Sequence, residues 1–347
     1  MIADGIDVMR QRGFAKIKAL LLLIFAVLAL PAHAVPVSNP FHALRAADQR
    51  VLTTGHRLAT ANAPFCRSRE NAAGLMLHHI GQYGDEAGAR AAFGFARDFA
   101  VLALVPGGPA ALAGLRQDDA LVALNGRDFT PSEAALADID QPDAYRPVAW
   151  ADAMLRTALD TGPVTLTVLR DGAIIDLTLA GTPACRTRFE LRATANYGAS
   201  ANGDTASITT AMLDFMHDDD ELAAILAHEL AHNLLEHRRR LNEAGIQRGL
   251  MQQLGRNARL TLATEIEADR LSIWLLANAG VDPQAAIRFW TRYGKARGKG
   301  IFSAPTHYRW KKRVGLFEEE IANLGTAERG EHGWMPPLLT EPLVGLK

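Results

Sequence analysis

This sequence of 347 residues has no basic stripe and almost no net charge. Lys and Arg together number 37 against 38 Asp and Glu, so the formal net charge is -1 and the isoelectric point is near 6.8. The short basic run Arg238-Arg239-Arg240 fits the C-terminal end of a helix better than a binding patch, because the helix dipole favours positive charge there. Nucleic acid is therefore not expected as a partner.

Long hydrophobic runs are also scarce. One lies near the N-terminus, from Ala19 to Leu30, and its roughly twelve apolar residues are fewer than the roughly twenty that a membrane-spanning helix needs. No later run is apolar enough to span a membrane. The composition, 48% hydrophobic and 22% charged, is that of a globular protein long enough for two domains.

The N-terminal run has the flanks of a targeting segment. The basic residues before it are Arg10, Arg12, Lys16 and Lys18. Ala32-His33-Ala34 follows as a small-x-small cleavage site, so we expect residues 1–34 to be a cleavable signal peptide, with its start at Met1 or Met9. A retained membrane anchor is the alternative. The residue directly after the cleavage site is Val35 and not cysteine, so lipid attachment has no acceptor there.

Cysteine occurs only twice, as Cys66 and Cys185. Export would bring both residues into an oxidising compartment, where such a pair is expected to form a disulfide. The alternative is two buried free thiols, which pack as small hydrophobic residues. The sequence predicts the Cys66–Cys185 disulfide.

The stretch from Asp218 to Arg240 has the pattern of a helix. Apolar residues recur at helical spacing, namely Leu222, Ile225, Leu226, Leu230 and Leu234. Acidic residues gather at its start and basic residues at its end, where the helix dipole favours each. We interpret His217 as a residue of the cap region and His237 as a residue of the helix end.

Two histidines of this helix, His228 and His232, are four residues apart and share one face. Their imidazole nitrogens can converge on a single metal ion. Glu229 projects beside the metal, where a general base for an activated water belongs. Because H-E-x-x-H strings also arise by chance, the alternative is a surface helix with two solvated histidines.

A second helix is predicted from about Leu260 to Ala279. Carboxylates in so apolar a helix are costly unless they meet positive charge. We predict that Glu265 is the third zinc ligand, which leaves a fourth position open for water. Asp269 is on the same face and would accept the free N–H of a ligand histidine, whereas Glu267 is the competing ligand but lies on another face. Ordinary exposed helix acids are the alternative for Glu265 and Asp269.

The strings H-E-L-A-H at 228–232 and E-x-E-A-D at 265–269 together resemble the zinc metalloproteases that include the CAAX prenyl endopeptidase, the heat-shock membrane protease HtpX and their soluble periplasmic relatives. The resemblance covers about Thr187 to Leu324. It implies that the third ligand is the Glu four residues before the Asp, which is Glu265 in this chain.

The segment Ser303–Arg313 resembles the T-H-P…R element of the same family, with Tyr308 in place of proline. By that resemblance His307 approaches the zinc, either as a hydrogen-bond donor to the developing oxyanion or as a temporary ligand. Arg313 is the matching basic residue. An ordinary loop histidine is the alternative for His307.

Between about Ala91 and Thr182, turn signals separate short apolar strands, and a helix is expected from about Val148 to Asp160. The string G-G-P-A-A-L-A-G-L…L-V-A-L-N-G resembles a PDZ domain, which implies a small half-open barrel. Phe93, Gly94 and Phe95 resemble its carboxylate-binding loop, whose backbone N–H groups would hold a peptide C-terminus. A module that serves only as a scaffold is the alternative.

Strands are also expected just before the metal helix, at Phe189–Ala195 and Thr205–Thr210. Zinc proteases of this kind hold extended substrate along an open strand edge at this place. We predict that Asn202, Ser207 and Thr209 line that edge, with plain strand residues as the alternative.

These patterns predict an α+β protein, in which a PDZ-like β-barrel is inserted beside a mainly helical zincin-type metalloprotease domain with a small edge-strand sheet. The expected segments are a signal peptide (1–34), an N-terminal helical segment that packs on the protease domain (35–90), the PDZ-like domain (91–183), the protease domain (184–328) and a loosely ordered tail (329–347). The expected function is a periplasmic zinc endopeptidase of misfolded envelope proteins, with one Zn2+ per chain and protein or peptide substrates selected by the PDZ-like module. The alternative is a periplasmic peptide-binding chaperone or adaptor with a closed zinc site.

Overall fold

The structure is a computed structural model that describes residues 39–246, 255–297 and 310–340. The predicted signal peptide and His307 lie outside the described residues. No described helix is both long enough and apolar enough to cross a membrane.

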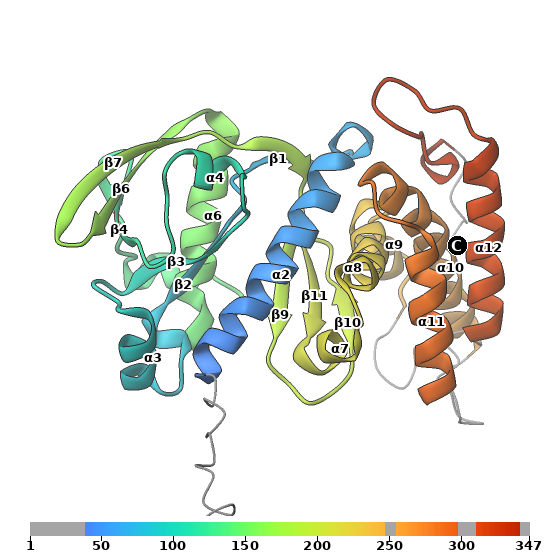
Figure 1. Ribbon diagram of the computed structural model, residues 1–347, viewed down its shortest axis with the longest axis horizontal. Coiled ribbons are helices and arrows are strands. Elements are labelled where there is room, and N and C mark those ends of the chain that lie inside the picture. The colour runs from blue at the N-terminus through green and yellow to red at the C-terminus, as the bar shows by residue number, and fades with distance from the viewer. Residues whose placement is uncertain (1–38, 247–254, 298–309, 341–347) are drawn as a thin grey trace, which may run out of the picture. The chain divides into compact units, whose positions relative to one another are not determined.

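The described chain mixes helices and sheets, which confirms the α+β prediction (Figure 1). The longer helices are α2 (Pro40–Ala61), α6 (Arg146–Thr161), α8 (Asp219–Leu234), α10 (Gly255–Asn278), α11 (Gln284–Arg297) and α12 (Trp310–Thr326). The shorter helices are α3 (Glu86–Phe93), α4 (Pro109–Leu112), α5 (Glu133–Ala137), α7 (Thr210–Phe215) and α9 (His237–Glu243). The strands are β1 (Arg69–Ala72), β2 (Leu75–His79), β3 (Phe99–Leu104), β4 (Ala120–Leu124), β5 (Arg127–Asp128), β6 (Val164–Arg170), β7 (Ala173–Leu179), β8 (Thr182–Cys185), β9 (Arg188–Arg192), β10 (Ala199–Ala201) and β11 (Thr205–Thr209).

Residues 75–179 form one antiparallel sheet in the order β2-β3-β4-β6-β7, with β5 paired to β4. The turns Asn125-Gly126 and Asp171-Gly172 have positive φ at both residues, 51° and 75° in the first and 50° and 79° in the second. This is the geometry of type I′ turns, whose twist suits a hairpin. We call this sheet with its covering helix α6 the β module.

The sheet of the β module is open. Within the described residues its end strands, β2 and β7, are not paired with each other. Helix α6 instead covers the apolar face that a barrel would close with strands, and it buries Ala151, Leu155 and Leu159 there. A closed PDZ-like barrel is therefore not seen, and the resemblance to a PDZ domain stays a prediction.

A separate three-stranded sheet has the order β10-β11-β9, in which β11 is antiparallel to β10 and parallel to β9. The sequence predicts only two strands here and misses β10. Because β11 is the central strand, the buried side chains of Ser207 and Thr209 do not line an edge, and that prediction is wrong. The Asn202 side chain accepts the backbone N–H groups of Asp204 and Thr205 within the turn. The edge strand next to α8 is β10.

The N-terminal segment is only partly helical, contrary to the prediction for residues 35–90. Helix α2 lies between the two sheets, where it contacts β3 and β9 (Figure 1). It is followed by the strands β1 and β2, and β1 pairs with β8, which places Arg69 opposite Cys185. The partner of β1 comes so much later in the chain that local periodicity could not reveal this strand.

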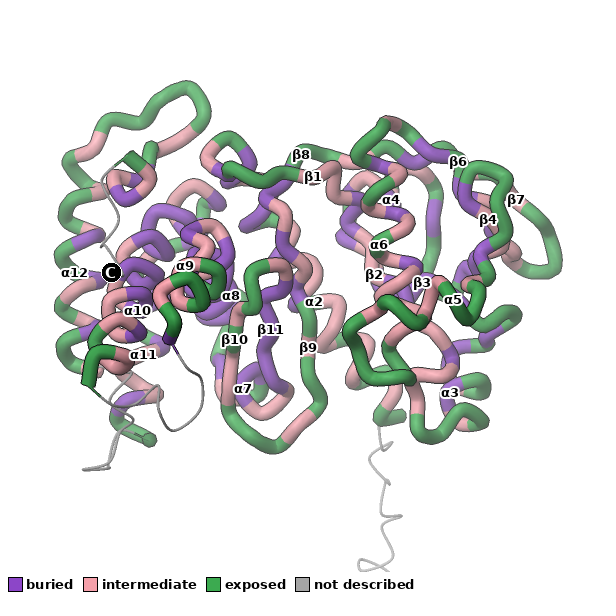
Figure 2. The backbone as a smooth tube through the Cα atoms, turned by 180° about the vertical axis from the view of Figure 1, so that it is seen from behind, coloured by how far each residue is buried: buried purple, intermediate pink, exposed green. Residues whose placement is uncertain are grey.

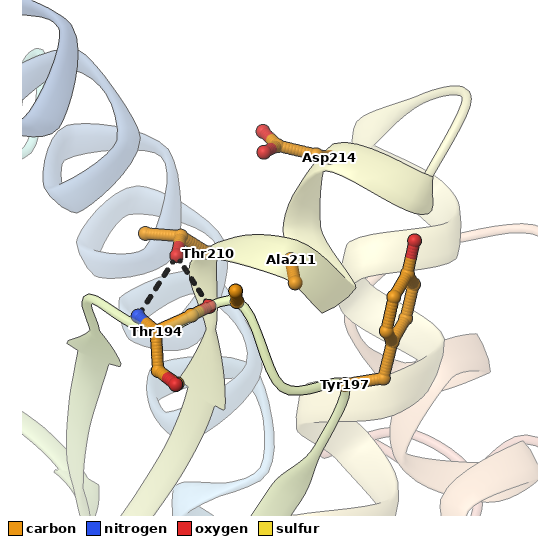
Figure 3. Close-up of a pocket in the computed structure, with 6 residues that line it drawn as sticks. Thr194, Tyr197, Thr210, Ala211 and Asp214 are labelled. Carbon is orange, nitrogen blue, oxygen red and sulfur yellow. Dashed lines mark hydrogen bonds between the residues drawn. The ribbon is translucent and has the colours of Figure 1, made fainter.

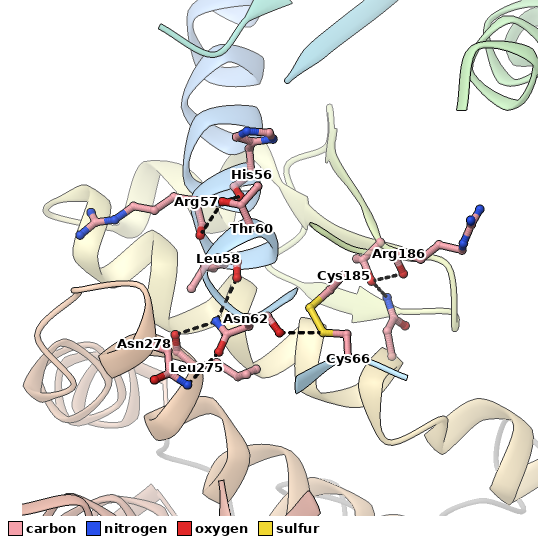
Figure 4. The surroundings of a disulfide bond; sticks show 12 residues. His56, Arg57, Leu58, Thr60, Asn62, Cys66, Cys185, Arg186, Leu275 and Asn278 are labelled. Carbon is pink, nitrogen blue, oxygen red and sulfur yellow. Dashed lines mark hydrogen bonds between the residues drawn. A yellow bond between two sulfur atoms is a disulfide. The ribbon is translucent and has the colours of Figure 1, made fainter. Parts of the chain in front are cut away.

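The predicted disulfide between Cys66 and Cys185 is present, with the two Cα atoms 5.4 Å apart (Figure 4). It joins the segment after α2 to the end of β8. Nearby, the Asn62 side chain donates to the carbonyl oxygens of Leu58 and Leu275, at 2.9 and 3.0 Å. The disulfide therefore lies close to the place where α2 meets α10.

Two large hydrophobic cores organise the described chain (Figure 2). The first, which we call the helical core, packs α8 and α10 against α2, β9, β11 and α11, and its fully buried side chains include Leu222, Leu226, Leu230, Ile208 and Phe289. The second lies inside the β module and includes Val101, Leu121, Leu166 and Val168.

The C-terminal residues up to 340 are attached to the helical core, whereas the sequence predicts a loose tail from 329. The Asn278 side chain accepts the N–H of Trp334 at 2.8 Å and donates to the Trp334 carbonyl at 3.0 Å. The same amide donates to Asn62, so this part of the tail is tied to both α10 and α2.

Candidate metal centre

Helix α8 begins as the sequence predicts. The Asp218 side chain accepts the N–H of Glu221 at 2.8 Å, and acidic residues occupy the first turn, where the helix dipole favours them. Nearly all of α8 is buried, so it is a core helix and not a surface helix with solvated histidines.

Three side chains from α8 and α10 converge on one point. The Nε2 atoms of His228 and His232 are 3.1 Å apart. Glu265 places Oε2 at 3.6 Å from His228 Nε2 and Oε1 at 3.4 Å from His232 Nε2. These ligand atoms all lie within 4.8 Å of one another. The structure thus brings together the three residues that the sequence predicts as metal ligands.

Asp269 and Arg313 lie next to this point. Asp269 Oδ1 lies 2.8 Å from His228 Nδ1, on the side of the ring away from Glu265. Arg313 reaches both acids, with Nη2 donating to Glu265 Oε2 at 3.1 Å and Nε lying 2.6 Å from Asp269 Oδ2. Its guanidinium also stacks on the Trp290 ring, 4.0 Å from the centroid. Each carboxylate is therefore held by the same buried cation.

Glu229 directly follows His228 on α8 and is 7% exposed. A buried carboxylate next in sequence to a candidate metal ligand can serve as a general base. Its catalytic role stays a proposal.

The sequence interpretation misses a second buried cluster. The chain leaves α8 after Leu234, passes through Glu236 at a positive φ of 52°, and starts α9 at His237. His237 is only 2% exposed, and its Nδ1 lies 2.8 Å from His232 Nδ1. It is therefore not an ordinary helix-end residue.

Glu267 completes this cluster. Its Oε2 lies 2.9 Å from His237 Nε2, and Arg240 donates to both of its oxygens at 2.6 and 3.3 Å. Glu267 is on another face of α10 than Glu265, as predicted, and it is buried. The available signal was its place in an apolar helix, where a carboxylate requires a positive or donating partner.

Burial and the surrounding charges shift the pKa values in opposite directions. Burial alone would lower the pKa of His228, but Asp269 and Glu265 outweigh it and raise this pKa to about 10. Burial lowers the pKa of His232 well below its ordinary value, and it lowers the pKa of His237 too. Burial would raise the pKa of Glu267, but hydrogen bonds from His237 and Arg240 lower it to about 2.

The donor set fits a catalytic metal ion. Two imidazole nitrogens and one carboxylate are the protein ligands of a common type of catalytic zinc site, which leaves one position for water or substrate. A carboxylate behind a ligand histidine, like Asp269 behind His228, fixes the ring and raises its basicity.

The predicted carboxylate-binding loop of the β module has a different local geometry. Phe93 ends α3, and Gly94 is its left-handed C-cap. The Gly94 N–H already donates to the backbone carbonyl of Arg90. The side chains of Phe93 and Phe95 are buried in an aromatic cluster with His78 and Tyr83. The role of this loop in binding stays a prediction.

An open pocket of about 510 Å3 lies where the segment before β10 meets α7 (Figure 3). Its lining residues are Thr194, Ala195, Tyr197, Thr210, Ala211 and Asp214. The Thr210 hydroxyl accepts the N–H of Thr194 at 3.1 Å and donates to its carbonyl at 2.9 Å, which fixes one wall.

Comparison with known proteins supports the metal centre. Residues 191–259 match the sequence model of Peptidase family M48. An aligned stretch of 138 residues is 28% identical to the mitochondrial metalloendopeptidase OMA1 of Schizosaccharomyces pombe, and it covers 34% of this chain and 41% of that protein. The chain thus spans less than half the length of this relative. The family match includes His228, Glu229 and His232 but ends before Glu265, so the place of Glu265 beside the two histidines comes from the structure alone. Over residues 191–259 the chain is therefore similar to M48 peptidases, and this stretch contains two of the three residues of the candidate metal centre.

Proposed function

We propose that this chain is an exported zinc endopeptidase. The observation that carries the proposal is the convergence of His228, His232 and Glu265 from two buried helices, beside the buried carboxylate of Glu229. Peptidases of family M48 depend on a metal, generally zinc, which agrees with this donor set. A zinc ion with only structural use would have four protein ligands and no need of a neighbouring base.

The three ligands would hold the ion, which supplies Lewis acidity that makes water acidic near neutral pH and polarises a peptide carbonyl. Glu229 takes a proton from the attacking water and delivers it to the leaving amine. Asp269 and Arg313 keep His228 and Glu265 in their orientations. His307 is proposed to donate a hydrogen bond to the oxyanion or to act as a temporary ligand, on the strength of its sequence element alone.

Extended substrate would pair with the edge of β10. This strand lies against α8, and the turn after it is attached to that helix because Gly203 N–H donates to Asn233 Oδ1 at 2.7 Å. Asn233 follows His232 directly, so this end of β10 is close to the ligand histidines. The pocket near Tyr197 lies toward the opposite end of β10 and would accept a side chain remote from the scissile bond.

We also propose that the β module selects substrates by their C-termini, as suits removal of misfolded envelope proteins. Support comes from the place of β2 at the end of the sheet and next to α6, since an extended peptide can add to a strand edge beside a helix. The chain should then bind a hydrophobic peptide with a free carboxylate more tightly than the same peptide with a C-terminal amide. Equal affinities in a fluorescence titration would contradict carboxylate recognition.

Substitution of Glu229 by Gln tests the catalytic proposal. Gln has the same shape but cannot take a proton, so hydrolysis of denatured casein should fall about 10²- to 10⁴-fold while zinc remains bound. Glu320→Gln is the matched control, because Glu320 is also a buried acid but pairs with Arg270 and Trp274 on the far side of α10. Undiminished proteolysis by Glu229→Gln would overturn the assignment, and a wild-type chain that binds zinc without hydrolysing any peptide would favour a binding protein.

A further inference from the structure

The two ligand histidines are oriented by different partners. His228 Nδ1 faces a carboxylate directly, that of Asp269, at 2.8 Å. His232 Nδ1 faces another imidazole, that of His237, also at 2.8 Å. A second imidazole can either accept or donate a hydrogen bond, so the geometry of this pair alone does not fix which nitrogen of His232 has the proton.

The groups behind His237 remove that ambiguity. Arg240 can only donate, and it donates to both oxygens of Glu267, which marks Glu267 as an acceptor. His237 Nε2, 2.9 Å from Glu267 Oε2, must then be the donor of that contact. In a neutral His237 the other nitrogen, Nδ1, is left as an acceptor. His232 must therefore donate from Nδ1, which leaves the lone pair of its Nε2 for a metal ion.

The backbone is shaped to place His237 there. In a continuous helix through residues 219–243, His237 would lie five residues after His232 and on another face of the same helix. The chain instead breaks α8 at Leu235 and takes Glu236 through the left-handed region, with φ 52°. A non-glycine residue rarely adopts that region, because its side chain is crowded there. The result is that α9 starts with a fully enclosed imidazole, 2% exposed, beside His232.

We propose that His237 is a positioning residue which, backed by Glu267 and Arg240, holds His232 in the tautomer and ring orientation that bind the metal. The inference rests on the proposed metal centre and deepens it. His237 does not touch the metal or the substrate. It acts through His232, as Asp269 acts through His228. Each ligand histidine is thus oriented by a group that leads back to an acid of α10, Asp269 or Glu267.

Zinc affinity of the full-length chain tests this inference. His237→Phe keeps a ring of similar size but removes both nitrogens, and it should weaken zinc binding about 10- to 100-fold in competition with a fluorescent chelator. His237→Asn restores an acceptor oxygen near the position of Nδ1 and should bind zinc more tightly than His237→Phe. The absorption spectrum of the cobalt-substituted chain should change in His237→Phe and return toward the wild-type spectrum in His237→Asn.

His78→Phe is the matched control. His78 is also fully buried, and its Nδ1 lies 2.8 Å from the Tyr83 hydroxyl, but it belongs to the β module. This variant should unfold more readily and yet bind zinc as the wild type does. If His237→Phe fails to fold, Glu267→Gln gives the same test. The amide of Gln can donate to His237 Nε2, so that His237 would donate from Nδ1 to His232 and no longer accept from it. This variant too should weaken zinc binding.

The outcomes separate the inference from the proposed function. Loss of an orienting partner is expected to weaken zinc binding about tenfold or more. If His237→Phe and Glu267→Gln both bind zinc within about twofold of the wild-type affinity, the proposed role of His237 is wrong. Proteolysis by the wild-type chain would still stand in that case. A wild-type chain that binds zinc but hydrolyses no peptide would instead overturn the endopeptidase proposal and leave the zinc comparison valid.

Discussion

The helical core and the core of the β module differ in how they contain charge. The helical core buries a set of ionisable groups, namely Glu221, His228, Glu229, His237, Glu265, Glu267, Asp269, Arg313 and Glu320. In residues 75–179 the buried polar side chains are only His78 and Asp119. Both cores contain ample Leu, Ile, Val and Phe, so apolar packing stabilises each of them.

This difference separates the part of the molecule that contains the candidate metal centre from the rest. Burial of an unpaired charge costs several kcal/mol, and even a well-paired buried ion pair adds little net stability. The helical core nevertheless contains two such pairs next to the candidate metal centre, Arg313 with Asp269 and Arg240 with Glu267. Apolar residues would stabilise the fold as well or better, so we infer that function retains the charges.

The largest effect is expected from Asp269→Asn. Asp269 is 0% exposed and faces both His228 and Arg313, so its neutralisation removes a carboxylate from a buried cation. The free energy of unfolding should fall by about 3–5 kcal/mol, as measured by urea denaturation. Zinc affinity should also fall about 10- to 100-fold. Loss of stability with unchanged zinc affinity would show that the buried charges are only structural.

Leu166→Ala in the β module is the matching change for the other core. Leu166 is fully buried on β6, and its truncation should cost about 2–5 kcal/mol of unfolding free energy. Zinc affinity measured on the folded variant should equal that of the wild type. A comparable loss of zinc affinity would mean that the two cores are not functionally distinct.

The sequence predicts much of the fold where the signals are local. The type I′ turns at Asn125-Gly126 and Asp171-Gly172 consist of residues that tolerate positive φ, so the sequence alone indicates them. Glu265 is also predicted, because helical spacing in two helices and a specific pair of motifs both point to it. Strands β1 and β10 are missed because each is short and is defined by pairing with another strand.

The cluster of His237, Glu267 and Arg240 is missed for a related reason. Residues 218–240 have one uninterrupted helical pattern, and the break at Glu236 uses a residue that rarely adopts a positive φ. Once the helix is assumed to continue, His237 lies at its end with no partner. Only the packing of α9 against α10 brings this imidazole and the Glu267 carboxylate together.

A proton and a metal ion would compete for His228 in this site. Asp269 and Glu265 raise the pKa of His228 to about 10, above its ordinary 6.5, so the proton on His228 stabilises the metal-free fold below pH 6.5. That contribution is lost as the pH rises through about 10. Zinc must displace this proton at neutral pH, so zinc affinity should fall as the pH is lowered.

A calorimetric zinc titration of the full-length chain at pH 8, in two buffers with different ionisation enthalpies, tests the central claim most directly. One zinc per chain should bind, with release of about one proton because His228 gives up its own, and Glu265→Ala should lose this binding. Absence of saturable binding at one equivalent, or the same binding in Glu265→Ala as in the wild type, would contradict the claim that His228, His232 and Glu265 form a metal centre.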